Sequence, residues 1–251
     1  MSRTSRFEAI ILRTHRFGDI HKRVTLLSGE YGVLDAIAYG AYSQKGKLRG
    51  VTSLFARGTC YLYTDPVKHT HKVTDFDVED FYIGINEEIV RFYTASLWVE
   101  VILKSYAGGE ASELLLRELG RFLSYLEGAT GQAATVISIQ FLWRYIGFLG
   151  LRPDLRSCER CGRTLGERES RYYVSGLQGF VCSECSEPGQ PKLQPEPAGY
   201  LMHTERKPVE SALEETPSEA AQRNIRGILY ALLEDVLEAR LNTLRTGSGI
   251  I

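Results

Sequence analysis

Four cysteines in the second half of the chain have the spacing of a metal site. Cys158 and Cys161 form one C-x2-C pair, Cys182 and Cys185 form another, and twenty residues separate the two pairs. Two residues between thiolates let one tight turn present both sulfurs to the same ion, and a second turn completes a tetrahedral shell. The pattern predicts a four-cysteine zinc ribbon. Because four thiolates leave no open position for water, we expect one structural zinc ion.

The residues between the pairs favour this interpretation. Gly162 supplies backbone freedom just after the second cysteine. Strand-forming residues at 172–174 and 179–181 predict two short strands joined by a turn at Gly176. The alternatives are two disulfides or a redox C-x2-C motif. Both require a different setting from the one that the sequence suggests. Cys60 lies outside the pattern among strand-forming residues, so we interpret it as a small buried thiol.

The charge of the chain is divided unequally. Residues 1–72 carry twelve lysines and arginines against five acids, whereas the rest of the 251 residues carry eighteen against twenty-six. The net charge of −1 therefore conceals a basic front and an acidic remainder. Such asymmetry favours a polyanionic partner for the front of the chain, and the alternative is a solvated basic face with no ligand.

The basic front has the pattern of a small β-barrel. Turn residues recur about every ten positions, with strand-forming residues between them. The expected strands are residues 7–13, 24–27, 32–39, 51–56, 59–63 and 71–78. We predict an N-terminal oligonucleotide-binding (OB) fold. A barrel of this kind presents one face and its loops to single-stranded nucleic acid.

One loop of this barrel combines aromatic and cationic residues. Residues 39–49 contain two tyrosines and three cations, which could stack on bases and neutralise phosphates. The alternative is a mobile hairpin whose lysines maintain solubility. The candidate DNA-binding residues are Arg16, Lys22, Arg23, Tyr39, Tyr42, Lys45, Lys47, Arg49 and Arg57.

After Asp80 the pattern becomes helical. We expect a helix over 87–106, capped by Asn86 and ended by Gly108 and Gly109, and further helices over 112–126 and 133–149. Residues 187–197 hold four prolines and predict a connector, and Thr216-Pro-Ser-Glu219 predicts a capping box. The last helix has an apolar stripe expected to pack on the earlier helices: Ile225, Ile228, Leu229, Leu232, Leu233, Val236 and Leu237.

These segments predict a multidomain α+β protein. The expected divisions are an OB-fold DNA-binding domain at 1–80, a helical domain at 81–157 and 187–251, and the zinc ribbon inserted at 158–186. The N-terminus lacks the apolar run of a signal peptide, and no segment approaches eighteen apolar residues, so a cytoplasmic location is expected.

Patterns typical of enzymes are weak. Gly40 to Lys47 misses the phosphate-binding loop in gap length and lacks the following Ser or Thr. Acids at Asp75, Asp77, Glu79 and Asp80 could hold magnesium, but their place on a strand and the turn after it favours a solvated edge. We expect no catalytic residues and no enzymatic activity.

The order of several motifs resembles the RecO family of bacterial recombination mediators. The matching segments are Ala9-Ile-Ile-Leu-Arg13 with Gly18-Asp19, Thr25-Leu-Leu-Ser-Gly-Glu-Tyr-Gly32, Ala38-Tyr-Gly-Ala41 with Lys45, Lys47 and Leu48, Gly147-Phe-Leu-Gly-Leu-Arg-Pro-Asp154, and the four cysteines. This resemblance implies the same order of OB barrel, helical domain and zinc ribbon. It also departs in places: Asp19 stands where the family commonly has glutamate, and Tyr42 and Gln44 where arginines are more common.

The resemblance also implies a function and partners. Members of this family bind single- and double-stranded DNA, anneal complementary strands, and act with RecR and the acidic tail of single-strand-binding protein (SSB) so that RecA can load. A link to RecF and an association with the nucleoid are further expectations. No motif in the helical part of the chain places the SSB tail. The alternative from another class is a zinc-ribbon OB-fold protein that binds RNA or acts in translation.

Overall fold

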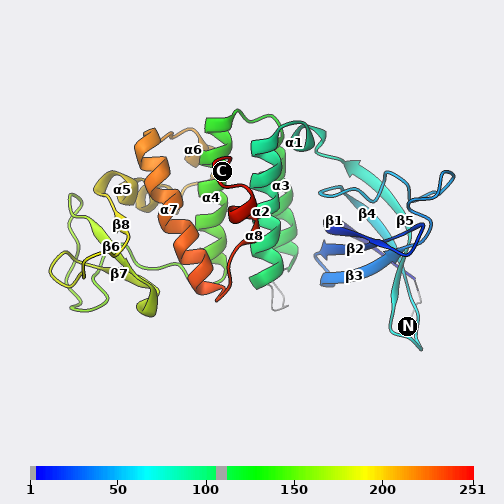
Figure 1. Ribbon diagram of the computed structural model, residues 1–251, viewed down its shortest axis with the longest axis horizontal. Coiled ribbons are helices and arrows are strands. Elements are labelled where there is room, and N and C mark those ends of the chain that lie inside the picture. Colours follow the sequence, from blue (N-terminus) through cyan, green and yellow to red (C-terminus); the bar gives the residue numbers. More distant parts are fainter. Residues whose placement is uncertain (1–3, 106–111) are drawn as a thin grey trace. The chain divides into compact units, whose positions relative to one another are not determined.

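The computed structural model describes residues 4–105 and 112–251. Contacts within the chain divide it into two compact units, Met1–Ala95 with Ser105–Gly128, and Ser96–Lys104 with Ala129–Ile251. The expected mixture of an N-terminal sheet with C-terminal helices is confirmed (Figure 1). Among the described residues, no helix combines the length and the apolar character needed to span a bilayer.

Five strands of the first unit close into a barrel (Figure 1). They are β1 (Thr4–Phe17), β2 (His21–Ser28), β3 (Gly32–Ala38), β4 (Arg57–Thr64) and β5 (His71–Asp80). Their order around the barrel is β1-β2-β3-β5-β4, and β4 pairs with β1 to close it. The β3–β5 pairing is parallel and short, whereas the other pairings are antiparallel.

The interior of the barrel follows from alternation along the strands. Phe7, Ala9 and Ile11 of β1 point into the same apolar cluster as Val24 and Leu26 of β2. Alternate residues point to opposite sides of a strand, so the other side of these strands carries Ile10 and Leu27. That side is also buried, because helix α3 (Ser112–Glu127) lies against β1 and β2.

The strand predicted at 51–56 is wrong. This segment belongs to an irregular loop between β3 and β4. The Thr52 hydroxyl donates to the Leu48 carbonyl oxygen at 3.0 Å, and both side chains are buried. Only the end of the loop joins the sheet, where the Phe55 backbone N–H donates to the Ile11 carbonyl oxygen at 2.8 Å. The loop caps the barrel because its apolar side chains fill the barrel end.

The first helical segment is interrupted at Glu88. Helix α1 (Ile83–Glu87) and helix α2 (Ile89–Ser105) replace the single helix expected after Asn86, which lies inside α1 and is not its cap. The backbone at Glu88 is extended, with φ −132° and ψ 124°, and its carboxylate accepts a hydrogen bond from the Arg91 backbone N–H at 3.1 Å. Because the Glu88 carboxylate satisfies this backbone N–H group of the first turn, a new helix begins here. The predicted stop at Gly108–Gly109 lies outside the described residues.

The second unit is built around α4 (Gly131–Phe148) and α7 (Glu219–Val236). The apolar stripe of α7 packs on α4 and on α5 (Pro195–Thr204), as the spacing predicted. Trp98, from the part of α2 in this unit, stacks on Phe141 with ring centroids 4.5 Å apart. Two short helices complete the unit, α6 (Val209–Leu213) and α8 (Asn242–Thr246).

The start of α7 differs from the prediction by two residues. Ser218 is the N-cap, and its hydroxyl oxygen accepts a hydrogen bond from the Ala221 backbone N–H at 3.2 Å. The capping box at Thr216 is therefore wrong. The proline-rich connector is also wrong, since residues 187–197 contain strand β8 (Lys192–Leu193) and the first residues of α5. Pro195 opens α5 because the first helical position needs no N–H donor.

The cysteine segment folds as a three-stranded sheet. Strands β6 (Arg171–Val174) and β7 (Gly179–Val181) pair as expected, joined by the 3-10 turn η1 (Ser175–Leu177). The third strand, β8, pairs with the other edge of β6 and was not predicted. A strand of two residues between prolines has too few positions to show alternation.

Candidate metal centre and nucleic-acid interface

The four predicted cysteines come together at one point in the second unit. The sulfur atoms of Cys158, Cys161, Cys182 and Cys185 all lie within 4.8 Å of one another. One pair comes from the turn before β6 and the other from the turn after β7. Gly162 adopts φ +72°, the left-handed conformation in which glycine is favoured, just after the second ligand. Among the described residues, this is the one cluster of three or more possible metal ligands.

The geometry of the cluster fits a metal ion better than disulfides. Four sulfurs placed about 2.3 Å from a tetrahedral ion lie about 3.8 Å from one another. The Cys161 and Cys182 sulfurs are 4.0 Å apart. A disulfide would need an S–S distance of about 2.05 Å. All four cysteines have free thiols, so the donor set is compatible with one four-coordinate ion.

Backbone donors favour the thiolate form of Cys158. Burial raises the pKa of Cys158, but backbone N–H groups of Cys161, Cys182 and Arg160 outweigh it and lower the pKa to about 6. The Cys182 N–H lies 3.3 Å from the Cys158 sulfur. These donors are fixed by the two tight turns. A thiolate is the form that binds metal, so the turns prepare the ligand as well as placing it.

Three arginines that the sequence analysis missed hold the two turns. Arg160 donates to the Cys185 carbonyl oxygen at 2.7 Å and thereby links both cysteine turns. Arg163 forms an ion pair with Glu169 at 3.0 Å. Arg171 is 1% exposed and donates to the carbonyl oxygens of Leu155 and Glu169, each at 2.6 Å. These arginines stand between and after the cysteines, so the sequence could have suggested that they stabilise the turns. Only the fold reveals which carbonyl and carboxylate oxygens accept their hydrogen bonds.

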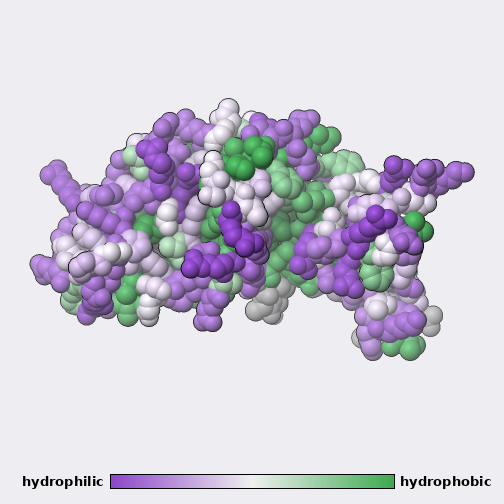
Figure 2. Space-filling model, viewed as in Figure 1, coloured by the Kyte–Doolittle hydropathy of each residue, from purple (hydrophilic) through white to green (hydrophobic). Residues whose placement is uncertain are grey.

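Most of the predicted DNA-binding residues lie on the surface of the barrel. Tyr39 and Tyr42 are 46% and 47% exposed. The Arg16 guanidinium lies 5.8 Å from the Tyr42 ring centroid, within cation–π range. The Arg23 guanidinium lies 5.3 Å from the ring centroid of Phe17, which the sequence analysis did not select. On the face drawn in Figure 2, hydrophilic residues cover much of the barrel.

Lys72 extends this set beyond the predicted residues. Its Nζ atom lies 5.7 Å from the ring centroid of Tyr39 and 5.6 Å from that of Tyr63. The parallel pairing of β3 with β5 brings Lys72 beside the end of β3. We call Arg16 with Tyr42, and Lys72 with Tyr39 and Tyr63, the aromatic–cation set. The sequence analysis missed Lys72 and Tyr63 because strand pairing alone places them beside Tyr39.

The cations of the loop after β3 project from the barrel cap. Lys45, Lys47 and Arg49 are exposed, while Ala41 and Leu48 beside them are buried. Lys47 forms an ion pair with Asp75 of β5. Arg49 donates to the Gln44 carbonyl oxygen at 3.4 Å. The loop thus packs Ala41 and Leu48 against the barrel and carries its cations on the outer side.

Two of the predicted cations are used inside the protein. Lys22 is 8% exposed, donates to the Thr52 carbonyl oxygen at 2.6 Å, and has a pKa lowered by burial. Arg57 donates from Nε to Glu8 at 2.7 Å. The Arg57 side chain also lies against Gly120 of α3, where a Cβ atom would come 3.1 Å from its Nη1 atom. Both side chains therefore have partners within the protein.

The predicted acid cluster on β5 has protein partners. Asp75 pairs with Lys47, and the Asp77 carboxylate accepts a hydrogen bond from the Tyr61 hydroxyl at 3.0 Å. Asp80 accepts from the Tyr82 backbone N–H at 2.7 Å. Asp75, Asp77 and Asp80 therefore each have a partner within the protein.

Comparison with known proteins identifies the same family over both parts of the chain. Residues 1–82 match the family model described as "Recombination protein O N terminal", and residues 86–245 match "Recombination protein O C terminal".

Curated relatives agree with these matches. A protein of Exiguobacterium sp. named DNA repair protein RecO is 27% identical over 237 residues, covering 94% of this chain and 92% of the relative. Proteins of the same name from Alkaliphilus metalliredigens and Symbiobacterium thermophilum are 24% and 25% identical over 178 and 192 residues. These cover 71% and 74% of this chain, and 70% and 73% of the relatives. The chain therefore belongs to the recombination protein O (RecO) family.

Proposed function

We propose that this protein is a non-catalytic DNA-binding mediator of recombinational DNA repair. Family membership supports a role in DNA repair and recombination, in line with the name of its relatives. The barrel order β1-β2-β3-β5-β4 supports our assignment of an OB fold, a five-stranded barrel used to bind oligonucleotides. On this proposal the barrel binds single- and double-stranded DNA.

The observation that carries the proposal is the aromatic–cation set, with the exposed loop cations on the same unit. Tyr39 and Tyr42 are exposed rings next to Lys72 and Arg16, so bases can stack where phosphates are neutralised. Each base stacked on an aromatic ring contributes about 1–3 kcal/mol. Neutralised phosphates release counterions, so the affinity falls steeply as salt rises.

The same surface accounts for strand annealing. Two complementary strands repel one another through their phosphates, and the repulsion falls when cations screen them. The barrel presents Arg16, Arg23, Lys72 and the loop cations together on one unit. Stacking on tyrosines has little base preference, so any complementary pair of strands can be held. Sequence preference should therefore be slight.

A salt series tests this function directly. The triple variant Lys45→Ala, Lys47→Ala and Arg49→Ala should weaken binding to a single-stranded DNA oligonucleotide and make the salt slope shallower by about 2 to 3. Tyr39→Ala with Lys72→Ala should weaken binding about tenfold or more. The matched control is Arg168→Ala, Arg206→Ala and Arg223→Ala in the second unit, which removes the same charge. Equal effects from both triples would remove the barrel from the mechanism.

Matched DNA and RNA oligonucleotides separate this function from its alternative. A repair mediator should anneal complementary DNA strands, whereas a protein acting in translation should prefer RNA. Annealing is measured by the quenching of paired dyes at equal protein concentration. Turnover of a nucleotide or nucleic acid by the purified protein would contradict the non-catalytic assignment.

The proposed partners follow from the family. We propose that the protein acts with RecR, with a functional link to RecF, to load RecA onto single strands coated with SSB, and that it contacts the acidic tail of SSB. A pull-down with the SSB tail peptide, with and without its terminal phenylalanine, tests the last contact. Capture of both peptides alike, or of neither, would contradict it.

We propose that the four-cysteine cluster holds one structural zinc ion. Cys158, Cys161, Cys182 and Cys185 would supply all four ligands, and the bound ion would cross-link the two turns. The protein's own part is to fix those turns through Arg160 and backbone N–H donors. Metal analysis should find one zinc per chain, and Cys161→Ser should lower that content. Full zinc content in that variant would contradict the ligand set.

A further inference from the structure

Lys22 occupies a core-facing position at one end of the barrel. Alternate side chains lie on the same side of a strand, so Lys22 shares its side of β2 with Val24 and Leu26. Those two residues belong to the apolar cluster inside the barrel, and Lys22 is 8% exposed. Burial lowers the pKa of Lys22, because an ammonium group loses hydration there. A buried lysine is costly unless its contacts offset that cost, so its contacts indicate its role.

Two contacts compensate for the burial of Lys22. The Nζ atom donates a hydrogen bond to the Thr52 carbonyl oxygen at 2.6 Å. The same atom lies 5.1 Å from the ring centroid of Tyr42, within cation–π range. Tyr42 itself is exposed. Lys22 therefore joins the interior of the barrel to an exposed ring of the aromatic–cation set.

The two residues before Lys22 anchor the same loop. The Tyr42 backbone N–H donates to the Ile20 carbonyl oxygen at 2.9 Å. The Gly40 backbone N–H donates to the Nδ1 atom of His21 at 3.0 Å. These bonds hold the backbone of the loop after β3 beside the start of β2. Lys22 adds a contact with the Tyr42 side chain, so the ring is held as well as the backbone.

Arg16 contacts the same ring and is itself held in place. Its guanidinium lies 5.8 Å from the Tyr42 ring centroid. Its Nη2 atom donates to the Asp19 carbonyl oxygen at 2.8 Å, which fixes the guanidinium to the turn between β1 and β2. Two cations against one ring limit its motion. A ring that is ordered before binding loses less conformational entropy when a base stacks on it.

We propose that Lys22 is a positioning residue for single-stranded DNA, which holds the Tyr42 ring as a stacking platform and does not bind phosphate. This inference rests on the proposed DNA binding of the barrel. The Lys22 ammonium group is buried and already donates to Thr52, so a phosphate has little access to it. Affinity therefore depends on Lys22 through base stacking and not through the release of counterions.

A double-mutant cycle on the full chain tests this role by fluorescence anisotropy with labelled oligothymidine. Lys22→Met should weaken binding about five- to tenfold, while the salt slope changes by less than about 0.3. In a Tyr42→Ala background, the same substitution should change affinity less than about twofold. Lys45→Met is the matched control at an exposed cation. It should lower the salt slope by about 1, and its effect should persist in the Tyr42→Ala background.

Fluorine NMR of the DNA-free chain labelled with fluorotyrosine tests the position of the ring separately. The Tyr42 resonance is identified by its absence in Tyr42→Phe. Its relaxation should report greater ring motion in Lys22→Met, while the resonances of Tyr145 and Tyr173 in the second unit stay unchanged. If Lys22→Met does not fold, Lys22→Gln takes its place in both measurements, since glutamine keeps an N–H donor without the charge.

Three results would overturn the inference and leave the proposed function standing. They are an unchanged affinity in Lys22→Met, an equal loss with and without Tyr42, and a salt slope that falls by about 1 in Lys22→Met. Unchanged ring motion in the fluorine spectra would also overturn it. Failure of the unsubstituted chain to bind oligothymidine would instead overturn the proposed function, and this inference with it.

Discussion

At the scale of single residues, the barrel separates cations that face solvent from cations used in folding. In the sequence, Lys22 and Arg57 were predicted to bind DNA for the same reason as Lys45 and Arg49: all four are cations of the basic N-terminal segment. Their carbonyl and carboxylate partners, Thr52 and Glu8, lie far from them in sequence. Local composition does not reveal a partner that is distant in sequence. Only the fold therefore shows which cations have partners within the protein and which face solvent.

The pairing of Lys47 with Asp75 leads to a prediction at this scale. The Asp75 carboxylate raises the pKa of Lys47 by hydrogen bonding. On our proposal it competes with a DNA phosphate for the ammonium group. Asp75→Asn should therefore strengthen binding of single-stranded DNA about two- to threefold at low salt, with the gain lost at high salt. Glu30→Gln, an exposed neutralisation on the same unit, is the control. Equal gains from both variants would show only a general effect of charge.

At the scale of elements, helices α7 and α8 begin at caps that the local sequence pattern did not identify. For α7, the sequence predicted Thr216 as the cap, whereas the hydroxyl of Ser218 makes the bond. For α8, the cap comes from α2: the Glu100 carboxylate accepts from the backbone N–H groups of Asn242 and Thr243, each at 2.8 Å. A cap supplied by a residue so far away in the sequence cannot be predicted from the residues next to the helix.

The two possible caps of α7 can be told apart by stability. Ser218→Ala should lower the free energy of unfolding by about 1 kcal/mol, since it leaves the Ala221 N–H without its acceptor. Thr216→Ala should lower it by less than about 0.5 kcal/mol. Urea denaturation followed by circular dichroism measures both values. A larger loss for Thr216→Ala would restore the sequence-based cap.

The cap of α8 should make stability depend on acid. Burial raises the pKa of Glu100, but the N–H donors of Thr243 and Asn242 outweigh it, so the folded pKa lies below the usual value of 4.5. A depressed carboxylate pKa stabilises the fold above the unfolded pKa, and this stability is lost as the pH falls through the folded pKa. Glu100→Gln should cost about 1–2 kcal/mol at neutral pH and less below about pH 4. Denaturation midpoints across pH 3–7 test this, and a constant loss would contradict it.

At the scale of the whole molecule, each part has its own apolar core. The barrel interior is a cluster of residues from its five strands and cap, whereas the ribbon has a separate small cluster around Cys158, Leu165, Val181 and Cys182. So small a cluster contributes little stability by itself, and on our proposal metal ligation adds to it.

Metal removal should accordingly act on the ribbon and spare the barrel. Chelation should increase amide exchange over residues 158–193 while single-strand DNA affinity changes less than about threefold. Hydrogen-exchange mass spectrometry and anisotropy on the same sample measure both effects. A loss of DNA affinity in step with zinc would show that the ribbon takes part in binding.

The sequence by itself determined the features set by short-range chemistry. Cysteine spacing selects a four-thiolate cluster, and alternating or three-four apolar periods select strands and helices. The front of the chain is basic because of composition alone.

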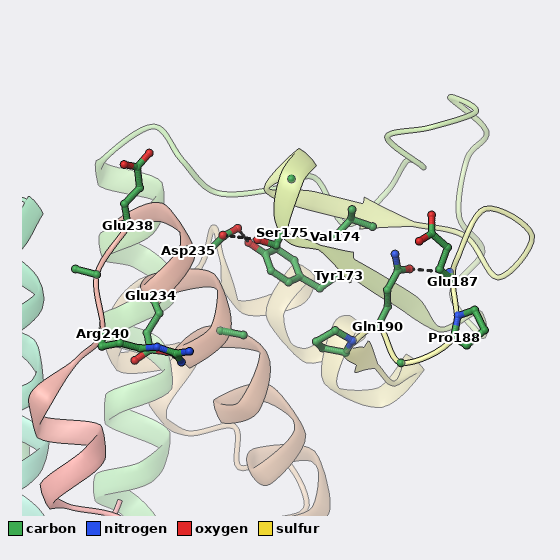
Figure 3. Close-up of a pocket in the computed structure, with 15 residues that line it drawn as sticks. Tyr173, Val174, Ser175, Glu187, Pro188, Gln190, Glu234, Asp235, Glu238 and Arg240 are labelled. Atoms are coloured by element: carbon green, nitrogen blue, oxygen red, sulfur yellow. Dashed lines mark hydrogen bonds and ion pairs between the residues drawn. The ribbon is translucent and has the colours of Figure 1, made fainter.

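Only the tertiary structure decided which surfaces those residues form. Strand pairing brings Lys72 to Tyr39, packing of the cap uses Lys22, and Tyr173 of β6 donates a hydrogen bond to Asp235 of α7 (Figure 3). The physical reason is that exposure and partnership depend on contacts between segments far apart in the chain, whereas spacing and propensity depend on neighbours within a few residues.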